Sequence, residues 1–152
     1  MKKLFTLICL FTSALLLIEC KKYPEGPSIS LRSKKARITD NWSVSKYLEN
    51  NVDLTTDFNI VFKNFYFVTS KDGEYLIKRT VVVFTTNVHT EEYGNWNLAS
   101  NKKTLNLIPV SISGGTLPPA SSWQILKLYE NEMWLRNIDS NGKVIEYHLV
   151  SA

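Results

Sequence analysis

The sequence predicts an all-β protein, a single eight-stranded up-and-down β-barrel that follows a signal peptide and a basic linker. Residues 38–152 consist of short runs rich in β-branched and aromatic residues, and turn-forming Gly, Asn and Pro separate these runs. A helix is expected only as a short piece around 45–50 or 54–58. A meander of strands leaves two exposed edges unless it closes on itself, so a closed barrel is the expected architecture.

The eight strands are expected in chain order, joined mostly by short turns. Because Phe62 and Phe65 fall on opposite parities of the second strand, a bulge or a change of facing is expected near Lys63-Asn64. The predicted strands cover 38–48, 57–70, 74–87, 94–99, 104–113, 122–130, 132–139 and 144–150.

Turn residues mark several of the predicted connections. Gly73 ends the turn Lys71-Asp72-Gly73, and Asn141-Gly142 is the strongest hairpin signal in the chain. Pro109 lacks an N–H group, so it should place an edge, a bulge or a break in its strand. The polar segment around His89, "NVHTEEYG", is expected to be a loop.

Residues 1–19 have the layout of a lipoprotein signal peptide. A basic start, Met1-Lys2-Lys3, precedes an apolar run of fifteen residues from 4 to 18. This run is shorter than the roughly 20 apolar residues that a membrane-spanning helix needs. The segment "LIEC" resembles the lipobox of bacterial lipoproteins, so Cys20 is expected to carry the lipid and to become the mature N-terminus. An uncleaved membrane anchor is the alternative.

Residues 20–37 are expected to form a lipidated basic tether. Between 21 and 37, six Lys and Arg oppose one Glu, a net charge of +5, whereas residues 38–152 contain ten Lys and Arg against twelve Asp and Glu, a net charge of −2. A basic strip suits an anionic membrane surface, and it equally suits a solvated, flexible linker. Because the aromatic-rich body is slightly acidic, nucleic-acid binding is not expected.

Four segments in this order resemble the lipocalin-like lipoproteins of Gram-negative bacteria: "CKKYPEGPSISLRSKKARI", "ITDNWSV", "YGNWNLASNKKTLNL" and "SWQILKLYENEMWLRNIDSNGKVIEYHLV". The resemblance implies a calyx-like barrel over residues 38–152, attached to a membrane through its N-terminal lipid, with a small hydrophobic ligand inside. Lys21 occupies the position where an aspartate resembles an inner-membrane retention signal. The outer membrane of the cell envelope is therefore the expected location.

Catalytic chemistry is not expected, and the sequence predicts neither an enzyme nor a cofactor. A nucleophilic triad needs a base, and the chain has only two histidines, His89 and His148. No serine occurs in a G-x-S-x-G context. Two distant histidines, with Cys20 as the single thiol of the mature chain, cannot form a zinc site, so no metal is expected.

The abundance of aromatic residues carries the prediction of a binding site. Tryptophans at 42, 96 and 123 are expected to fill the core at close packing. The candidate residues for a ligand-binding mouth or an exposed contact face are Phe65, Phe67, Phe84 and Trp134. Two functions stay open: a carrier of a small hydrophobic ligand, and a non-enzymatic interaction module of the envelope (an inhibitor, adaptor or assembly subunit) with a filled barrel. The sequence identifies no protein partner.

Overall fold

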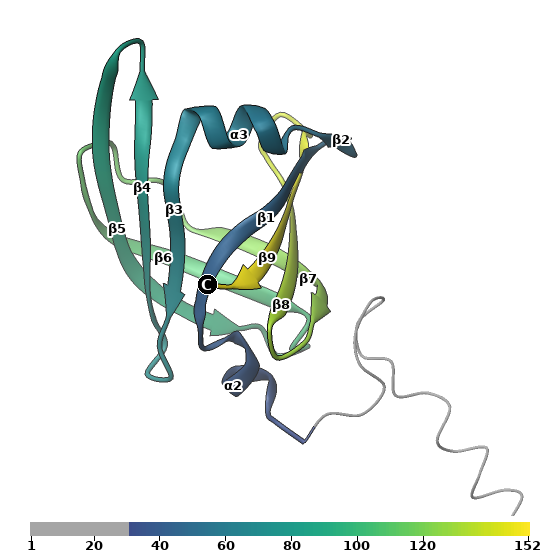
Figure 1. Ribbon diagram of the computed structural model, residues 1–152. Helices are drawn as coiled ribbons and strands as arrows, with labels where there is room; N and C mark the ends of the chain where they lie inside the picture. Colours follow the sequence, from purple (N-terminus) through teal and green to yellow (C-terminus); the bar gives the residue numbers. More distant parts are fainter. Residues whose placement is uncertain (1–30) are drawn as a thin grey trace, which may run out of the picture.

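The computed structural model describes residues 31–152, which form a closed antiparallel β-barrel (Figure 1). Each strand pairs with the next along the chain, and β1 also pairs with β9, which closes the wall. The eight wall strands are β1 (Asn41–Glu49), β3 (Phe62–Thr69), β4 (Glu74–Val83), β5 (Thr86–Leu98), β6 (Thr104–Ser113), β7 (Ser121–Leu128), β8 (Glu132–Ile138) and β9 (Val144–Ser151). The predicted fold class is confirmed. The predicted signal peptide, Cys20 and the first part of the tether lie outside the described residues.

The β4–β5 hairpin differs from the prediction. The strand predicted over 74–87 ends at Val83, and Phe84-Thr85 forms a two-residue turn between Val83 and Thr86. Strand β5 then runs through the segment predicted as a polar loop, so His89 is a strand residue opposite Thr80. Phe84 has a φ of 55°, which bulky residues rarely adopt, and the turn contains neither Gly nor Asn. The sequence therefore gives no local signal for this turn.

Helix α3 (Thr55–Val61) confirms the short helix expected around 54–58, and it continues into the first part of the predicted second strand. The N-cap residue of the helix, Leu54, makes no side-chain cap hydrogen bond, but the Asp53 carboxylate, at the end of the two-residue strand β2 (Val52–Asp53), accepts the backbone N–H of Thr55 at 3.0 Å. The alternation of Phe58 and Ile60 suggests a strand, but only Phe58 is buried: it is 4% exposed, against 60% for Ile60. The helix thus directs Phe58 toward the barrel and leaves the next apolar residue in water.

Two predicted irregularities are confirmed. The pairing of β3 with β4 changes register between Lys63 and Tyr66. On β6, Pro109 pairs with Gly94 while Ser111 pairs with Tyr93, so one extra residue bulges next to the proline. A residue without an N–H group disturbs the ladder at this point, as expected.

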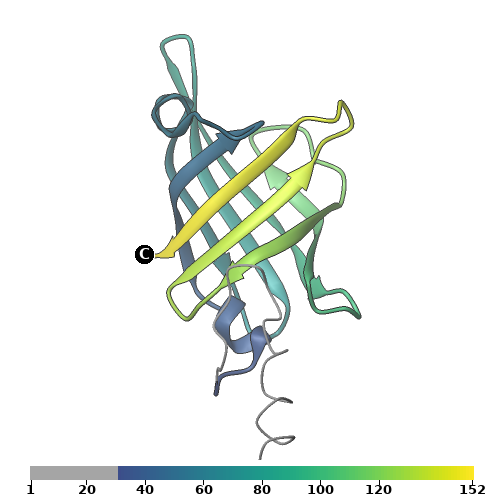
Figure 2. The ribbon, with the colours of Figure 1, turned by 90° about the vertical axis from the view of Figure 1, so that its right-hand side faces the viewer.

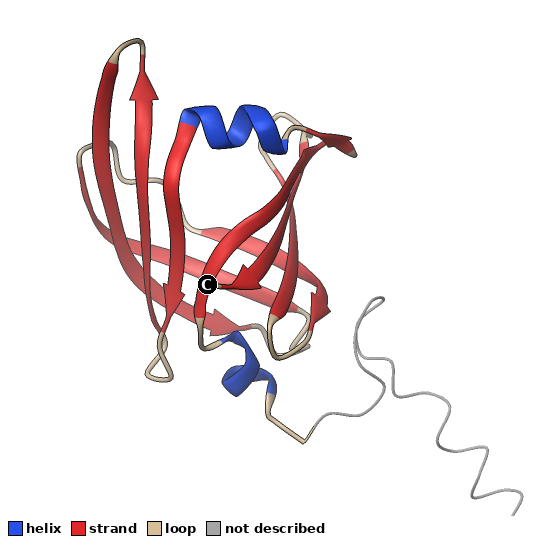
Figure 3. Cartoon of the chain, viewed as in Figure 1, coloured by secondary structure: helices blue, strands red, loops and turns tan. Residues whose placement is uncertain are grey.

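One end of the barrel is closed by helix α2 (Lys34–Ile38), which lies below the strands in Figure 3. The Ser33 hydroxyl caps this helix by accepting the backbone N–H of Ala36 at 3.1 Å. The Arg37 guanidinium donates to the carbonyl of Leu128, and Ile38 is fully buried. Residues 34–37, predicted as the end of a flexible tether, are therefore part of the body.

The core fills the α2 end of the barrel with apolar side chains from all eight strands of the wall and from helix α2. The Trp42 ring is fully buried, and its Nε1 donates to the carbonyl of Ile38 at 2.8 Å, so the indole N–H is satisfied inside the core. The core residues are Ile38, Trp42, Phe67, Tyr75, Trp96, Leu105, Leu107, Ile125, Leu128, Met133, Leu135 and Leu149.

The opposite end, which we call the α3 end, is less completely paired. Strand β6 pairs with β5 as far as its last residue, Ser113, but with β7 only over Thr104–Leu107, and Pro109 lies two residues beyond that pairing. The loop 114–120 then returns the chain to β7. On the other side of the molecule, β7, β8, β9 and β1 form a continuous wall (Figure 2). The barrel is thus packed solid at the α2 end and opens between β6 and β7.

Candidate ligand-binding site

A cavity of about 300 Å³ lies inside the barrel above the packed core. Its volume is at the lower end of the range of small-molecule sites, roughly 300–1,000 Å³. The cavity is lined by Phe65, Phe67, Ile77, Arg79, Glu92, Leu107, Pro109, Pro118, Pro119, Ser121, Trp123, Leu135, Tyr147 and Leu149. Most of these side chains are apolar, and the two prolines of the loop 114–120 stand at the opening between β6 and β7.

Tyr147 of β9 is the centre of an aromatic cluster on one side of the cavity. Its ring lies parallel to that of Phe65, at an interplanar angle of 12° and a centroid distance of 6.1 Å. The ring of Trp123 lies 5.4 Å away, and the ring of Phe58 from helix α3 lies 5.7 Å away. Rings from β3, β7, β9 and α3 therefore form one rigid apolar surface, and ring pairs of this kind each add stability beyond the area they bury.

Arg79 of β4 is the cationic group of this cavity. It alternates along the strand with the exposed Lys78 and shares the parity of Ile77, which also lines the cavity, so its side chain points inward. The guanidinium carbon lies 5.6 Å from the centre of the Phe62 ring. Its Nε is buried and has no hydrogen-bond partner, and the guanidinium forms no ion pair with any residue in 31–152. A buried donor without a partner is unusual and calls for a physical explanation.

Glu92 of β5 lies in the same cavity, closer to the packed core. It pairs with Ile77 in the β4–β5 ladder. The next inward-facing pair toward the α3 end is Arg79 with Thr90. Its Oε1 accepts the hydroxyl of Tyr75 at 2.7 Å, and the carboxylate is buried. Glu92 thus has a partner of its own and does not neutralise Arg79 by a direct ion pair.

The phenol groups near the cavity are held in the neutral form. Burial raises the pKa of Tyr147 to about 12, and the nearby Arg79 charge opposes part of that rise. Burial and the hydrogen bond to Glu92 raise the pKa of Tyr75 as well. At neutral pH both hydroxyls therefore keep their protons and can donate hydrogen bonds.

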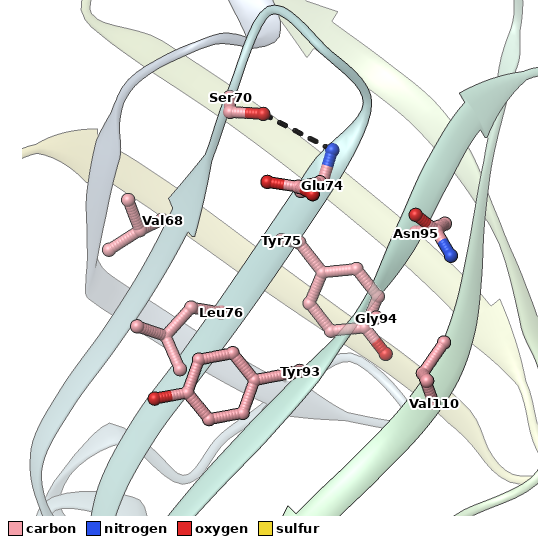
Figure 4. A pocket seen from close by; sticks show the side chains of 9 residues that line it. All are labelled: Val68, Ser70, Glu74, Tyr75, Leu76, Tyr93, Gly94, Asn95 and Val110. Atoms are coloured by element: carbon pink, nitrogen blue, oxygen red, sulfur yellow. Dashed lines mark hydrogen bonds between the residues drawn. The ribbon is translucent and has the colours of Figure 1, made fainter.

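A second concavity, the outer groove, lies on the outside of the wall near the β3–β4 turn (Figure 4). Its volume is about 450 Å³, and Leu76 and Tyr93, paired in the β4–β5 ladder, form its middle. Val110 at its edge is 62% exposed. The acidic side chain of the outer groove, Glu74, is exposed to water, unlike the buried Nε of Arg79, and the groove lies on one face of the wall. The interior cavity is therefore the better candidate site.

The structure separates the four aromatic residues predicted for a site. Phe65 and Phe67 both line the interior cavity. Phe84 is 98% exposed at the tip of the β4–β5 hairpin, far out on the α3 end. Trp134 does not line the cavity: it stacks on His148 at 3.8 Å, and the ammonium of Lys127 lies 4.3 Å from its ring centre. The four residues do not form one site.

The three residues that give the cavity its charge and its phenol group, Arg79, Glu92 and Tyr147, were not predicted as site residues. For Arg79 a signal was present, because the run "YLIKRTV" places a charge in the same phase as Tyr75, Ile77 and Val81. Tyr147 is in the inward phase of β9, and its role arises only when β9 meets β1. Glu92 gave no signal, since its segment was expected to be a loop.

Neither histidine belongs to a catalytic or metal-binding constellation in the part of the chain that the structure describes. His89 Nδ1 lies 3.0 Å from the Thr80 hydroxyl, and His148 Nε2 lies 2.6 Å from Glu146 Oε1. Within residues 31–152, no group of three His, Cys, Asp or Glu side chains is arranged to hold a metal ion. In the same residues no helix has both the length and the apolar character needed to cross a membrane.

Comparison with known proteins adds no further assignment. No protein-family model matches this chain, and no curated protein is measurably similar to it. The cavity and its residues are therefore the basis for assigning a function.

Proposed function

We propose that this protein is a non-enzymatic carrier that holds a small hydrophobic ligand inside its barrel, and that a lipid on Cys20 tethers it to the outer membrane of a Gram-negative cell. The observation that carries the proposal is the cavity of about 300 Å³ in the α3 half of the barrel. Apolar side chains line it, a few polar groups converge on it, and it opens through a gap in the wall. These are the features of small-molecule sites in barrels.

The gap in the wall supports the proposal because it has a specific cause. Strand β7 begins at Ser121, which pairs with Leu107, so the rest of β6, from Ile108 to Ser113, has no β7 residue beside it. Pro118 and Pro119 line the resulting opening. A ligand entering here would meet Trp123 and Tyr147 without unfolding any strand. An eight-stranded barrel is just wide enough to be filled by its own side chains or to hold one small ligand, and here part of the interior is unfilled.

Binding of a neutral apolar dye tests the proposal. The protein would be the full mature chain, residues 20–152, with Cys20→Ser so that it carries no lipid. N-phenyl-1-naphthylamine should bind with increased fluorescence, and Pro118→Trp, which fills the opening, should weaken binding at least tenfold.

Two variants control for location. Leu117→Trp adds the same ring to the adjacent, exposed position of the loop and should leave binding unchanged. Val110→Glu places a charge in the outer groove and should also leave it unchanged. Dye binding that is lost in Val110→Glu and retained in Pro118→Trp would move the site to the outer groove and overturn the proposal.

The outer groove favours a second candidate function, an interaction module that binds a protein partner on the outside of the wall. The observation behind it is the exposed apolar row on β3–β6, where Tyr93 is 45% exposed and Val110 is 62% exposed. The interaction module is expected to have a barrel filled by its own side chains, and the interior cavity counts against that expectation. The dye experiment separates the two functions, because a partner-binding module needs no interior ligand.

The proposed anchor is tested separately in a Gram-negative host. The native chain should fractionate with the outer membrane, and Cys20→Ala should abolish labelling by a radioactive fatty acid. Equal labelling of both chains would contradict lipidation at Cys20. Labelled chain found in the inner-membrane fraction would contradict the proposed location.

A further inference from the structure

We propose that the ligand is an amphipathic anion, a medium-chain carboxylate, whose head group is bound by Arg79 and the hydroxyl of Tyr147 while its chain lies against the aromatic cluster. This inference rests on the proposed function, since it names the ligand class of the same cavity. The two groups come from strands on different sides of the barrel, β4 and β9, and both line the cavity.

The guanidinium of Arg79 is the first argument. Its charge lies among apolar walls, its Nε is buried without a partner, and it has no ion pair in residues 31–152. Burying a donor or a charge without a partner is unfavourable, and a ligand carboxylate would remove this penalty. The planar fork of Arg matches a carboxylate and can bind it through two hydrogen bonds.

Tyr147 supplies a second donor. Its hydroxyl has no hydrogen bond to any described residue, and Arg79 lies near enough for its charge to act on the phenol. The neutral phenol can donate its O–H to a ligand oxygen, and the guanidinium beside it can donate its N–H groups to the same ligand. Glu92 lies closer to the packed core than Arg79, and its Oε1 already accepts the hydroxyl of Tyr75. Its negative charge disfavours a head group at the bottom of the cavity, so the carboxylate is expected at the level of Arg79 with the chain toward Phe65 and Trp123.

Decanoate and 1-decanol form the test pair, because they share the same chain and differ in the charge of the head group. Each would displace N-phenyl-1-naphthylamine from the mature Cys20→Ser chain at pH 7.5, below the concentration at which it aggregates. Decanoate should bind at least tenfold more tightly than decanol. Arg79→Gln should abolish this preference by weakening decanoate binding at least tenfold more than decanol binding, and Arg79→Lys should restore part of it.

Two further variants separate charge recognition from a general change in the cavity. Tyr147→Phe keeps the ring and removes only the hydroxyl, so decanoate binding should fall severalfold more than decanol binding. Glu92→Gln keeps an acceptor for Tyr75 and removes the negative charge, so decanoate should bind severalfold more tightly. Variants that only damage the fold would weaken both ligands together.

The outcomes distinguish this inference from the proposed function. Equal affinity for decanoate and decanol, unchanged in Arg79→Gln, would overturn the anionic ligand and leave the carrier function standing. A preference for decanoate that persists in Arg79→Gln would place the head group elsewhere and would likewise overturn the inference. Failure of the dye and of both ligands to bind would overturn the carrier function itself.

Discussion

Gly94 lies on β5 where the ring of Tyr75 crosses the inner surface of the wall. A Cβ atom at this position would meet Tyr75 Cε1 at 2.5 Å and would also collide with the carbonyl oxygen of Ile108. The missing side chain therefore has two consequences: the β5–β6 ladder can close beside the Pro109 bulge, and Tyr75 can reach Glu92. One glycine thus fixes the partner of the only carboxylate among the residues that line the cavity.

The variant Gly94→Ala should lower the free energy of unfolding by roughly 1–3 kcal/mol, because the added methyl group meets backbone that cannot move freely. Urea denaturation followed by tryptophan fluorescence would measure the loss. Gly115→Ala is the matched control: its Cβ would make only an ordinary contact with Ile112, at 3.6 Å, and its φ is not in the left-handed region. Equal losses in the two variants would contradict the packing argument.

Tyr147 should make the barrel less stable at alkaline pH. In the unfolded chain it loses its proton near pH 10, whereas burial keeps its pKa at about 12 in the folded protein. Between these values the unfolded state binds fewer protons, so the free energy of unfolding falls as pH rises from about 10 to about 12. Tyr147 should contribute roughly 2 kcal/mol to this fall.

Thermal or urea unfolding between pH 8 and pH 11.5 would measure the effect. The raised pKa values of Tyr47 and Tyr75 act in the same direction, so the native chain should lose more than the share of Tyr147 alone. Tyr147→Phe should show a correspondingly smaller loss at high pH. An identical pH dependence in both chains would refute a buried, neutral Tyr147.

Helix α3 acts as a plug at the scale of secondary-structure elements. Strands β1 and β3 pair through only two residue pairs, Asn41 with Val68 and Trp42 with Phe67, and then separate toward the α3 end. The Phe58 ring fills the space between them, with Tyr47 at 4.8 Å and Phe62 at 5.0 Å between ring centres. A short helix therefore completes the wall where the ladder stops and supports one side of the cavity.

The variant Phe58→Ala should destabilise the protein by about 3–5 kcal/mol, as expected for a buried Phe that leaves a cavity. Ile60→Ala, on the exposed side of the same helix, should change stability by no more than about 0.5 kcal/mol. Chemical denaturation of both variants would give the difference. Similar small effects at the two positions would show that the strands close without the plug.

At the scale of the whole molecule, the two ends of the barrel have different tasks. The α2 end holds the core, and helix α2 joins it to the predicted tether through Arg37 and Ile38. The α3 end holds the cavity, the gap between β6 and β7 and the projecting β4–β5 hairpin (Figure 1). In the proposed carrier the anchor therefore attaches to the rigid end, and the ligand enters at the opposite end.

A chain that begins at Thr39 should be less stable than one that begins at Leu31, by at least about 2–5 kcal/mol. The shortened chain loses the fully buried Ile38 side chain and the carbonyl that accepts the Trp42 indole N–H. Urea midpoints of the two chains would measure the difference. Equal midpoints would contradict a structural role of α2 and would restore the predicted boundary between tether and body at residue 37.

Local patterns in the sequence predicted much of the fold. β-Branched runs with turns such as Asn141-Gly142 gave the number of strands and their order, because strand and turn preferences act over a few residues. Local patterns failed where a distant partner decides. Phe84 occupies a turn with a left-handed φ because the paired β4 and β5 hold it there. Phe58 lies on a helix, where its ring packs into the space between β1 and β3.

The sequence by itself determined the closed all-β architecture, the Lys63 and Pro109 irregularities, and two cavity residues, Phe65 and Phe67. Only the tertiary structure decided which side chains share the cavity. Arg79 and Tyr147 are separated by most of the body in sequence, and they line one cavity because the wall curves until β1 meets β9. Closure could be expected because open edges are unfavourable, but no local preference encodes which side chains the closed wall brings together. The binding chemistry therefore depends on contacts that exist only after the barrel has closed.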